Sequence, residues 1–214
     1  MNYERLYQYR FRGIDQTARE AVWKEIAPHI YGLMGRPAKV LDPAAGRGEF
    51  INNIPAGERW AVDSVVYPEH SPRLGTRFIA SDIFDVELPN EHFDGIWVSN
   101  FLEHLPTQEA IASFLEKMYA AAALGGRIAV MGPNFRYCER EYFDCADHTL
   151  ALTHVAIAEH LYAAGFEPVK LVPRYLPYSF RSRLPPSRKL TRQYLRLPAV
   201  WRLLGKQYLV IGQR

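Results

Sequence analysis

The stretch KVLDPAAGRGEF, residues 39–50, decides the fold of this 214-residue chain. A short apolar run ends on an acid, Asp42, and a turn that contains Gly46 and Gly48 follows at once. A glycine-rich turn between a strand and its helix lets the backbone approach a ligand closely, and the N-terminus of the helix favours polar or anionic groups. The stretch therefore predicts a nucleotide-binding turn, followed by a helix that begins near Gly46 and ends at Pro55.

The order of these residues restricts the ligand. The third glycine of the dinucleotide pattern G-x-G-x-x-G is absent, because Ile51 stands in its place. A carboxylate at Asp42 would repel a pyrophosphate but would favour a cationic group. Asp63, 21 residues further on at the end of a second expected strand, suits the acid that holds ribose hydroxyls. S-Adenosylmethionine, which carries a ribose, an ammonium and a sulfonium but no phosphate, fits this description.

Apolar runs that alternate with amphipathic helical patterns predict a parallel sheet covered on both faces. Strands are expected over 38–41, 59–63, 77–82, 92–100, 127–133, 166–172 and 207–212. Helices are expected over 15–34, 107–123 and about 152–164, with a polar loop over 134–149. The pattern predicts one domain over 1–214, with an N-terminal helical cap at 1–34 and a basic insert at 178–204 between the last two strands. Prolines 185, 186 and 198 interrupt any helical periodicity in that insert.

The loop that contains Asp147 and His148, followed by Arg174–Tyr178, loosely resembles methyltransferases encoded with surface-polysaccharide and natural-product enzymes. Taken together, the motifs described above resemble the class I S-adenosylmethionine-dependent methyltransferases. The likeness runs in order over residues 15–173 and rests on five segments: Val40–Gly48, Asp63, Ser81–Ile83, Phe93–Leu105 and Leu124–Val130. The resemblance implies an α/β fold, a Rossmann-like three-layer sandwich. Its seven-stranded, mostly parallel sheet would have the order 3-2-1-4-5-7-6 and a reversed last strand.

The resemblance also implies a set of cofactor-binding residues: Asp42, Ala44, Gly46, Gly48, Asp63, Asp82, Ile83 and Asn100. Asp42 would lie under the methionine half, Asp63 would bind the ribose hydroxyls and Asp82 would bind the adenine amino group. Each also has a local alternative, namely a helix N-cap for Asp42, a solvated strand-end acid for Asp63 and a turn cap for Asp82. Asn100 could contact the cofactor or close a turn. Ala44 departs from the family pattern, which has its first glycine at this position.

Methyl transfer to an alcohol needs a group that takes the proton, and histidine suits that task near neutral pH. His104 follows the fourth expected strand and His148 lies in the loop after the fifth, so both are candidate general bases. Helix capping is the alternative for His104, and an ordinary surface loop is the alternative for His148. We expect Tyr137, Asp147 and Arg181 to contact the substrate. Asp144, Asp147 and His148 could hold a divalent metal, but their close spacing and the lack of a wider ligand set favour no metal.

Charge is distributed unevenly along the chain. Residues 1–173 hold 16 Lys and Arg and all 23 Asp and Glu, whereas residues 174–214 hold 10 Lys and Arg and no acid. Such a basic segment could meet a phosphate-bearing acceptor, a membrane surface or RNA, or could be a solvated helix face. DNA is disfavoured, because Ser99-Asn100-Phe101-Leu102 replaces the Pro-Pro-aromatic element of amino-methylating enzymes and neither cysteine follows a proline.

These features predict a methyltransferase that uses S-adenosylmethionine to O-methylate a saccharide or another small molecule, including phosphate-bearing ones. The alternatives are an RNA methyltransferase and a non-catalytic adenosylmethionine-binding partner protein. No apolar run approaches the length of a membrane span, and the first residues lack the apolar core of a signal peptide. We therefore expect a cytoplasmic location, with Cys138 and Cys145 reduced.

Overall fold

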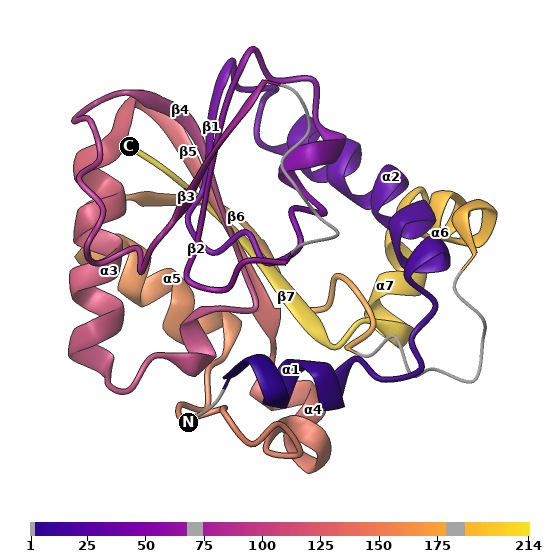
Figure 1. The fold of residues 1–214 in the computed structure, drawn as a ribbon. Helices are drawn as coiled ribbons and strands as arrows, with labels where there is room; N and C mark the ends of the chain where they lie inside the picture. The colour runs from indigo at the N-terminus through magenta and orange to yellow at the C-terminus, as the bar shows by residue number, and fades with distance from the viewer. Residues whose placement is uncertain (1–2, 68–74, 179–186) are drawn as a thin grey trace.

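A seven-stranded sheet between two layers of helices forms the body of the protein (Figure 1). The computed structural model describes residues 3–67, 75–178 and 187–214. The strands are β1 Lys39–Asp42, β2 Glu58–Asp63, β3 Thr76–Ala80, β4 Phe93–Ser99, β5 Ala122–Pro133, β6 Glu167–Val172 and β7 Gln207–Gln213. Their order is β3-β2-β1-β4-β5-β7-β6, with β7 antiparallel to both of its neighbours. The predicted order and the reversed last strand are confirmed.

Helices cover both faces of this sheet, as the alternating pattern predicts. They are α1 Tyr3–Arg10, α2 Gln16–Leu33, α3 Gln108–Ala121, α4 Phe135–Tyr142, α5 His154–Ala163, α6 Arg188–Leu195 and α7 Pro198–Leu204. In Figure 1, α3 and α5 lie on one face, while α2, α6 and α7 lie on the other. Side chains that begin helices make local caps. Asp15 accepts from the Ala18 N–H, and Thr107 does the same for Ala110.

The two cores follow from the alternation of side chains along each strand. Val40 and Ala129 are buried with Ile26 and Ile30 of α2 on one face. Their neighbours in the sequence, Leu41 and Val130, point to the other face. There they are buried with Phe114 and Met118 of α3 and with Ile157 and Leu161 of α5. Because both faces of the central strands are covered, each strand reads as a continuous apolar run.

The predicted helix after Gly46 is wrong. Residues 43–50 form consecutive turns, and only a short 3-10 helix, η1 Ile51–Asn53, follows. Gly46 and Gly48 adopt positive φ angles of 52° and 70°, which a regular helix excludes. Only a few residues then remain before Pro55, and the residue that precedes a proline is disfavoured in helical conformation.

The predicted polar loop over 134–149 also contains a helix, α4. Cys138 and Tyr142 are both buried, and α4 is kinked at Cys138, whose φ of −136° is not helical. The Tyr142 hydroxyl donates to the Leu150 carbonyl at 2.8 Å, which ties α4 to the loop that follows it. The charged residues 139–141, which lie between Cys138 and Tyr142, made this segment resemble a polar loop in the sequence.

The basic segment before β7 contains two helices in its described part, α6 and α7, and Pro198 begins α7 in the first-turn position where proline is tolerated. Arg188 and Arg192 of α6 both bind the Glu25 carboxylate of α2, at 2.6 and 2.7 Å. These two arginines lower the pKa of Glu25 to about 2. The division of the chain into a cap at 1–34, a body and an insert at 178–204 stays a prediction.

Within the described ranges, no helix combines the length and apolar character that a membrane crossing requires.

Candidate functional site

A cavity of about 590 Å³ opens where β1, β2 and β4 end. Ligands bind at this end of open α/β sheets because the loops that follow the strands diverge there. Its lining includes every predicted cofactor residue except Gly48, namely Asp42, Ala44, Gly46, Asp63, Asp82, Ile83 and Asn100. Residues of the N-terminal segment line it as well: Tyr7 and Arg10 of α1, Phe11 after α1, and Arg19 and Trp23 of α2. One cavity therefore joins the strand-end acids to the N-terminal segment.

Asp42 ends β1 and is 2% exposed. Burial and the nearby Asp63 raise its pKa well above the usual range. A cationic ligand would reverse this penalty, because an opposite charge favours the ionised carboxylate. Since no regular helix follows, Asp42 is not the helix cap that the sequence left open.

The turn itself is held by Asp63 at the end of β2. Its two carboxylate oxygens accept from the Gly46 N–H at 2.7 Å and from the Val65 N–H at 2.8 Å. Each oxygen keeps a second lone pair for a ribose hydroxyl. Ala44 is not among the described residues with positive φ, so alanine fits the position where the family pattern has a glycine. The special backbone angles fall on Gly46 and Gly48 instead.

Asp82, Ile83 and Asn100 complete the predicted cofactor set. Asp82 accepts from the Phe84 N–H at 3.0 Å and so closes the turn after β3, while it also borders the cavity. Ile83 is 3% exposed and packs into the core beside it. Asn100, directly after β4, has a φ of 49°, a left-handed angle that is uncommon outside glycine and often found at functional sites.

Arginine and aromatic side chains also line the cavity. Phe50 and Trp97 stack at 4.7 Å between ring centroids in the cavity wall. Arg19 of α2 pairs with Glu49, and the Arg47 guanidinium lies 4.8 Å from the centre of the Tyr67 ring. The cavity thus presents both a buried carboxylate and cationic groups, as a zwitterionic ligand requires.

The other end of the cavity is built from segments that are distant in sequence. Arg10 of α1 forms an ion pair with Asp147, in the loop after α4. His104 contacts the same residue, because His104 Nδ1 lies 3.1 Å from the carbonyl oxygen of Asp147 and 3.3 Å from Asp147 Oδ2. Although burial opposes it, the hydrogen bond from Arg10 and the charge of His104 lower the pKa of Asp147. His104 borders the cavity, so the chain Arg10–Asp147–His104 presents an oriented imidazole there.

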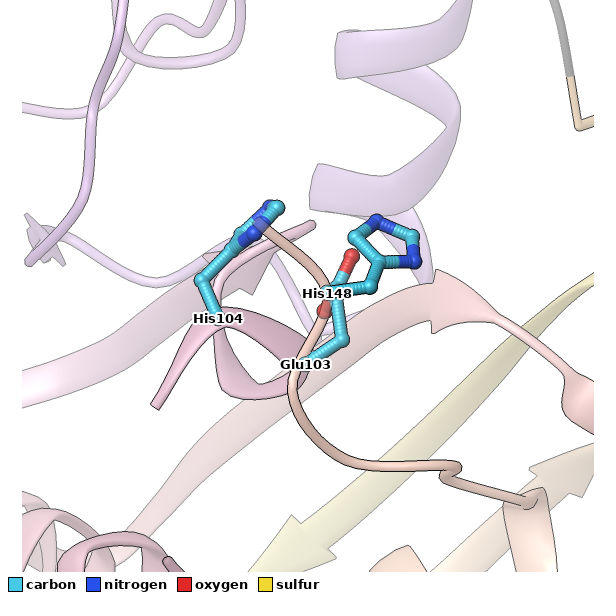
Figure 2. Close-up of side chains that lie close together, drawn as sticks. All are labelled: Glu103, His104 and His148. Carbon is cyan, nitrogen blue, oxygen red and sulfur yellow. The ribbon is translucent and has the colours of Figure 1, made fainter. Parts of the chain in front are cut away.

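His148 lies beside His104, with 4.9 Å between the ring centroids. Burial and the neighbouring His104 lower the pKa of His148 to about 4, so it is neutral near pH 7. Glu103, the residue before His104 in the 3-10 helix η3 Leu102–His104, is 1% exposed, and burial raises its pKa. Figure 2 shows the Glu103 carboxylate between the two imidazoles. The sequence indicated both histidines but not this glutamate.

The three expected substrate residues lie in different surroundings. Asp147 is buried by Arg10 and His104, behind the cavity wall. Tyr137 of α4 lies outside the cavity lining, with the Arg174 guanidinium 5.0 Å from its ring centre. Arg181 falls outside the described residues. The binding and catalytic roles assigned from the sequence stay predictions for all of these residues.

Sequence reasoning missed the contribution of α1. Tyr7, Arg10 and Phe11 line the cavity, although the only signal for them was the mixture of aromatic and basic residues at the start of the chain. The cysteines, by contrast, agree with expectation, because both are free thiols. Cys138 donates to the Asn134 carbonyl, and Cys145 lies 3.4 Å from the Tyr178 hydroxyl.

A protein-family model matches the part of the chain that forms the cofactor side of the cavity. Residues 41–130 match the family model described as a methyltransferase domain. This range runs from the last two residues of β1 into β5, and it contains Asp42, the glycine turn and Asp63. Residues 41–130 thus match a methyltransferase domain, and the fold around them is that of S-adenosylmethionine-dependent methyltransferases. The cofactor of this methyltransferase family, S-adenosylmethionine, is the one that the strand-end acids predict.

Solved structures share the fold of this methyltransferase. A SAM-dependent methyltransferase from Archaeoglobus fulgidus is 20% identical, with a TM-score of 0.67 and 100% of each chain covered. The 1,6-didemethyltoxoflavin-N1-methyltransferase of Burkholderia thailandensis, with bound 1,6-didemethyltoxoflavin and S-adenosylhomocysteine, is 23% identical with a TM-score of 0.62, over 99% of this chain and 88% of that one. The N-methyltransferase NodS of Bradyrhizobium japonicum in complex with S-adenosylhomocysteine is 13% identical with a TM-score of 0.63, over 99% and 97%. No curated protein matches the chain.

Proposed function

We propose that this methyltransferase transfers the methyl group of S-adenosylmethionine to a hydroxyl oxygen of a saccharide or another small molecule. The observation that carries the proposal is the single cavity that runs from the buried Asp42 to the oriented imidazole of His104. One end suits a cationic adenosyl ligand, and the other offers a group that can take a proton from an acceptor.

The cofactor would lie across the ends of the strands. Its ammonium would pair with Asp42, its ribose hydroxyls would donate to Asp63, and its adenine would meet Asp82 and Ile83. Arg19 and Arg47, which border the same cavity, supply positive charge for the methionine carboxylate. This orientation directs the sulfonium methyl group toward the His104 end.

Methyl transfer is an in-line displacement, so alignment of the acceptor contributes most of what the protein must supply. The acceptor oxygen forms a bond to the methyl carbon as the carbon–sulfur bond breaks, and that electron pair stays on sulfur to give S-adenosylhomocysteine. The hydroxyl proton passes to His104, whose Nδ1 is held by Asp147 so that Nε2 is presented to the cavity side. His148 would support this imidazole from the other side.

The charges around the cavity favour an acceptor without phosphate. Arg10, the cation at the acceptor end, is already paired with Asp147. Two arginines of the basic segment, Arg188 and Arg192, likewise pair with a carboxylate of this chain, Glu25. Two proteins that share the fold, 1,6-didemethyltoxoflavin-N1-methyltransferase and the N-methyltransferase NodS, are consistent with a small acceptor. A cytoplasmic location stays a prediction.

Two measurements on the full chain test the proposal. Calorimetry should show that S-adenosylmethionine and S-adenosylhomocysteine bind, and failure of both would overturn the proposal. Transfer of a labelled methyl group should then be followed over a panel of saccharides, nucleotide sugars, small phenols and a short RNA. Label on a hydroxyl of a small molecule supports the proposal. Label on RNA alone, or cofactor binding without transfer to any acceptor, would support the RNA enzyme or the non-catalytic partner protein instead.

A further inference from the structure

We propose that Glu103, His104 and His148 together bind a divalent first-row transition-metal ion, Zn²⁺ or Mn²⁺, at the acceptor end of the cavity. This inference rests on the proposed methyl transfer to a hydroxyl, and it replaces the role of His104 as base with that of a metal ligand. It also replaces the expectation, drawn from the sequence, that the protein binds no metal.

The three side chains come together from two segments. Glu103 and His104 are adjacent in η3, and His148 comes from the loop after α4. One ligand atom from each lies within 4.8 Å of the others. A bound ion at about 2.0–2.2 Å from each ligand would require the three groups to move somewhat closer together. Figure 2 shows the Glu103 carboxylate between the two imidazoles, where one ion could be reached by all three side chains.

The state of Glu103 is the strongest reason to expect a cation. Both carboxylate oxygens are buried and have no hydrogen-bond partner among the described residues, and Nδ1 of His148 is in the same condition. A buried polar group without a partner costs free energy, and a buried carboxylate costs more. An ion between them would satisfy both groups at once.

The surroundings also match those of a metal site. Ligating histidines commonly donate their second ring N–H to a carboxylate or a carbonyl, and His104 Nδ1 meets both on Asp147. The loop that carries His148 is tied to η3, because the Thr149 N–H and hydroxyl donate to the Glu103 carbonyl at 2.9 and 3.1 Å. The ligands are therefore held in place by groups that do not themselves bind the ion.

The donor set selects the class of ion. Two imidazoles and one carboxylate suit Zn²⁺, Mn²⁺ and similar ions, whereas Mg²⁺ and Ca²⁺ prefer oxygen ligands. Three protein ligands leave open positions for an acceptor oxygen, and His104 places the ion at the cavity wall. The ion would stabilise the deprotonated acceptor hydroxyl, so that its proton leaves to solvent and His104 acts as a ligand in place of a base.

Metal binding can be measured without any acceptor. The full chain should be stripped with a chelator and titrated with ZnCl₂, MnCl₂ and MgCl₂ by calorimetry, with metal content measured by mass spectrometry. We expect one equivalent of Zn²⁺ or Mn²⁺ to bind more tightly than Mg²⁺. His148→Asn and Glu103→Gln should abolish this uptake, and Asp147→Asn should weaken it by about 10- to 100-fold. His160→Asn, on α5, where the imidazole contacts Gln108 and none of the three ligands, should leave it unchanged.

The outcomes separate this inference from the proposed function. Absence of stoichiometric uptake by the wild-type chain, or uptake that survives both His148→Asn and Glu103→Gln, would overturn the metal site. Glu103 would then be a neutral acid in the core. If Glu103→Gln does not fold, judged by circular dichroism, His148→Asn and the wild-type titration still decide. Cofactor binding measured in the presence of chelator tests the proposed function alone, because Asp42 and Asp63 are not ligands of the ion.

Discussion

The two ends of the cavity are built in different ways. The cofactor end consists of residues that directly follow β1, β2, β3 and β4, so strand order alone brings them together. The acceptor end joins α1, the 3-10 helix after β4 and the loop after α4 through ion pairs and hydrogen bonds. Arg10 and Asp147, for example, meet although 137 residues separate them. The first end follows from local pattern and topology, and the second follows from side-chain contacts between distant segments.

This difference implies that the two ends can be disabled separately. A change at the acceptor end should remove turnover and spare cofactor binding, while a change at the cofactor end should remove binding. Variants that disturb both ends together would show that the contrast is wrong.

The largest effect is expected from His104→Asn. Loss of the imidazole removes the group that activates the acceptor, as a base or as a metal ligand, and should lower turnover by about 10²- to 10⁴-fold. Affinity for S-adenosylmethionine, measured by calorimetry, should stay unchanged. His160→Asn is the matched control and should keep full turnover. Equal losses of turnover and cofactor affinity in His104→Asn would contradict the separation of the two ends.

Asp42→Asn should weaken S-adenosylmethionine binding by roughly 30-fold, about 2 kcal/mol, because a charged hydrogen-bond partner is lost. The same change removes a buried negative charge next to Asp63, so the ligand-free protein should unfold at an equal or higher temperature. Calorimetry and thermal unfolding measure the two quantities. Asp94→Asn, at the opposite end of β4, serves as the control, and its cofactor affinity should not change. Unaltered binding in Asp42→Asn would show that this acid does not face the cofactor.

A smaller effect is expected from Asp147, which acts through His104. Asp147→Asn and Arg10→Met should each lower kcat roughly tenfold, and the double variant should lose little more, because the two side chains act as one unit. A double-mutant cycle on turnover measures this coupling. Additive losses would mean that the ion pair does not position the imidazole.

The smallest effect lies outside both ends, at Glu25. Its folded pKa of about 2 is below the usual 4.5, so its pairing with α6 stabilises the protein above about pH 4.5. That contribution disappears as the pH falls toward 2. Glu25→Gln should therefore lower the unfolding temperature slightly at pH 7, with the difference from wild type shrinking between pH 4.5 and pH 2. Glu20→Gln, exposed on the same helix, should show no such pH dependence.

Much of the fold could be predicted because its signals are local. Asp42 and Asp63 stand at the ends of apolar runs, and parallel strands with a common direction bring such ends to one edge of the sheet. Two predictions failed where local patterns compete. The turn after Asp42 uses positive φ at Gly46 and Gly48 and forms no regular helix, and α4 conceals its apolar face among charges.

The sequence by itself therefore determined the strands and the end at which a cationic adenosyl ligand would bind, because periodicity and strand-end residues carry that information. The order of the strands was predicted only through the resemblance to the methyltransferases. Only the tertiary structure decided how the acceptor end is assembled. The ion pair of Arg10 with Asp147, the orientation of His104 and the burial of Glu103 depend on three segments packing together. The partner and the burial of a charged side chain depend on contacts between distant segments, so the spacing of residues along the sequence cannot predict either of them.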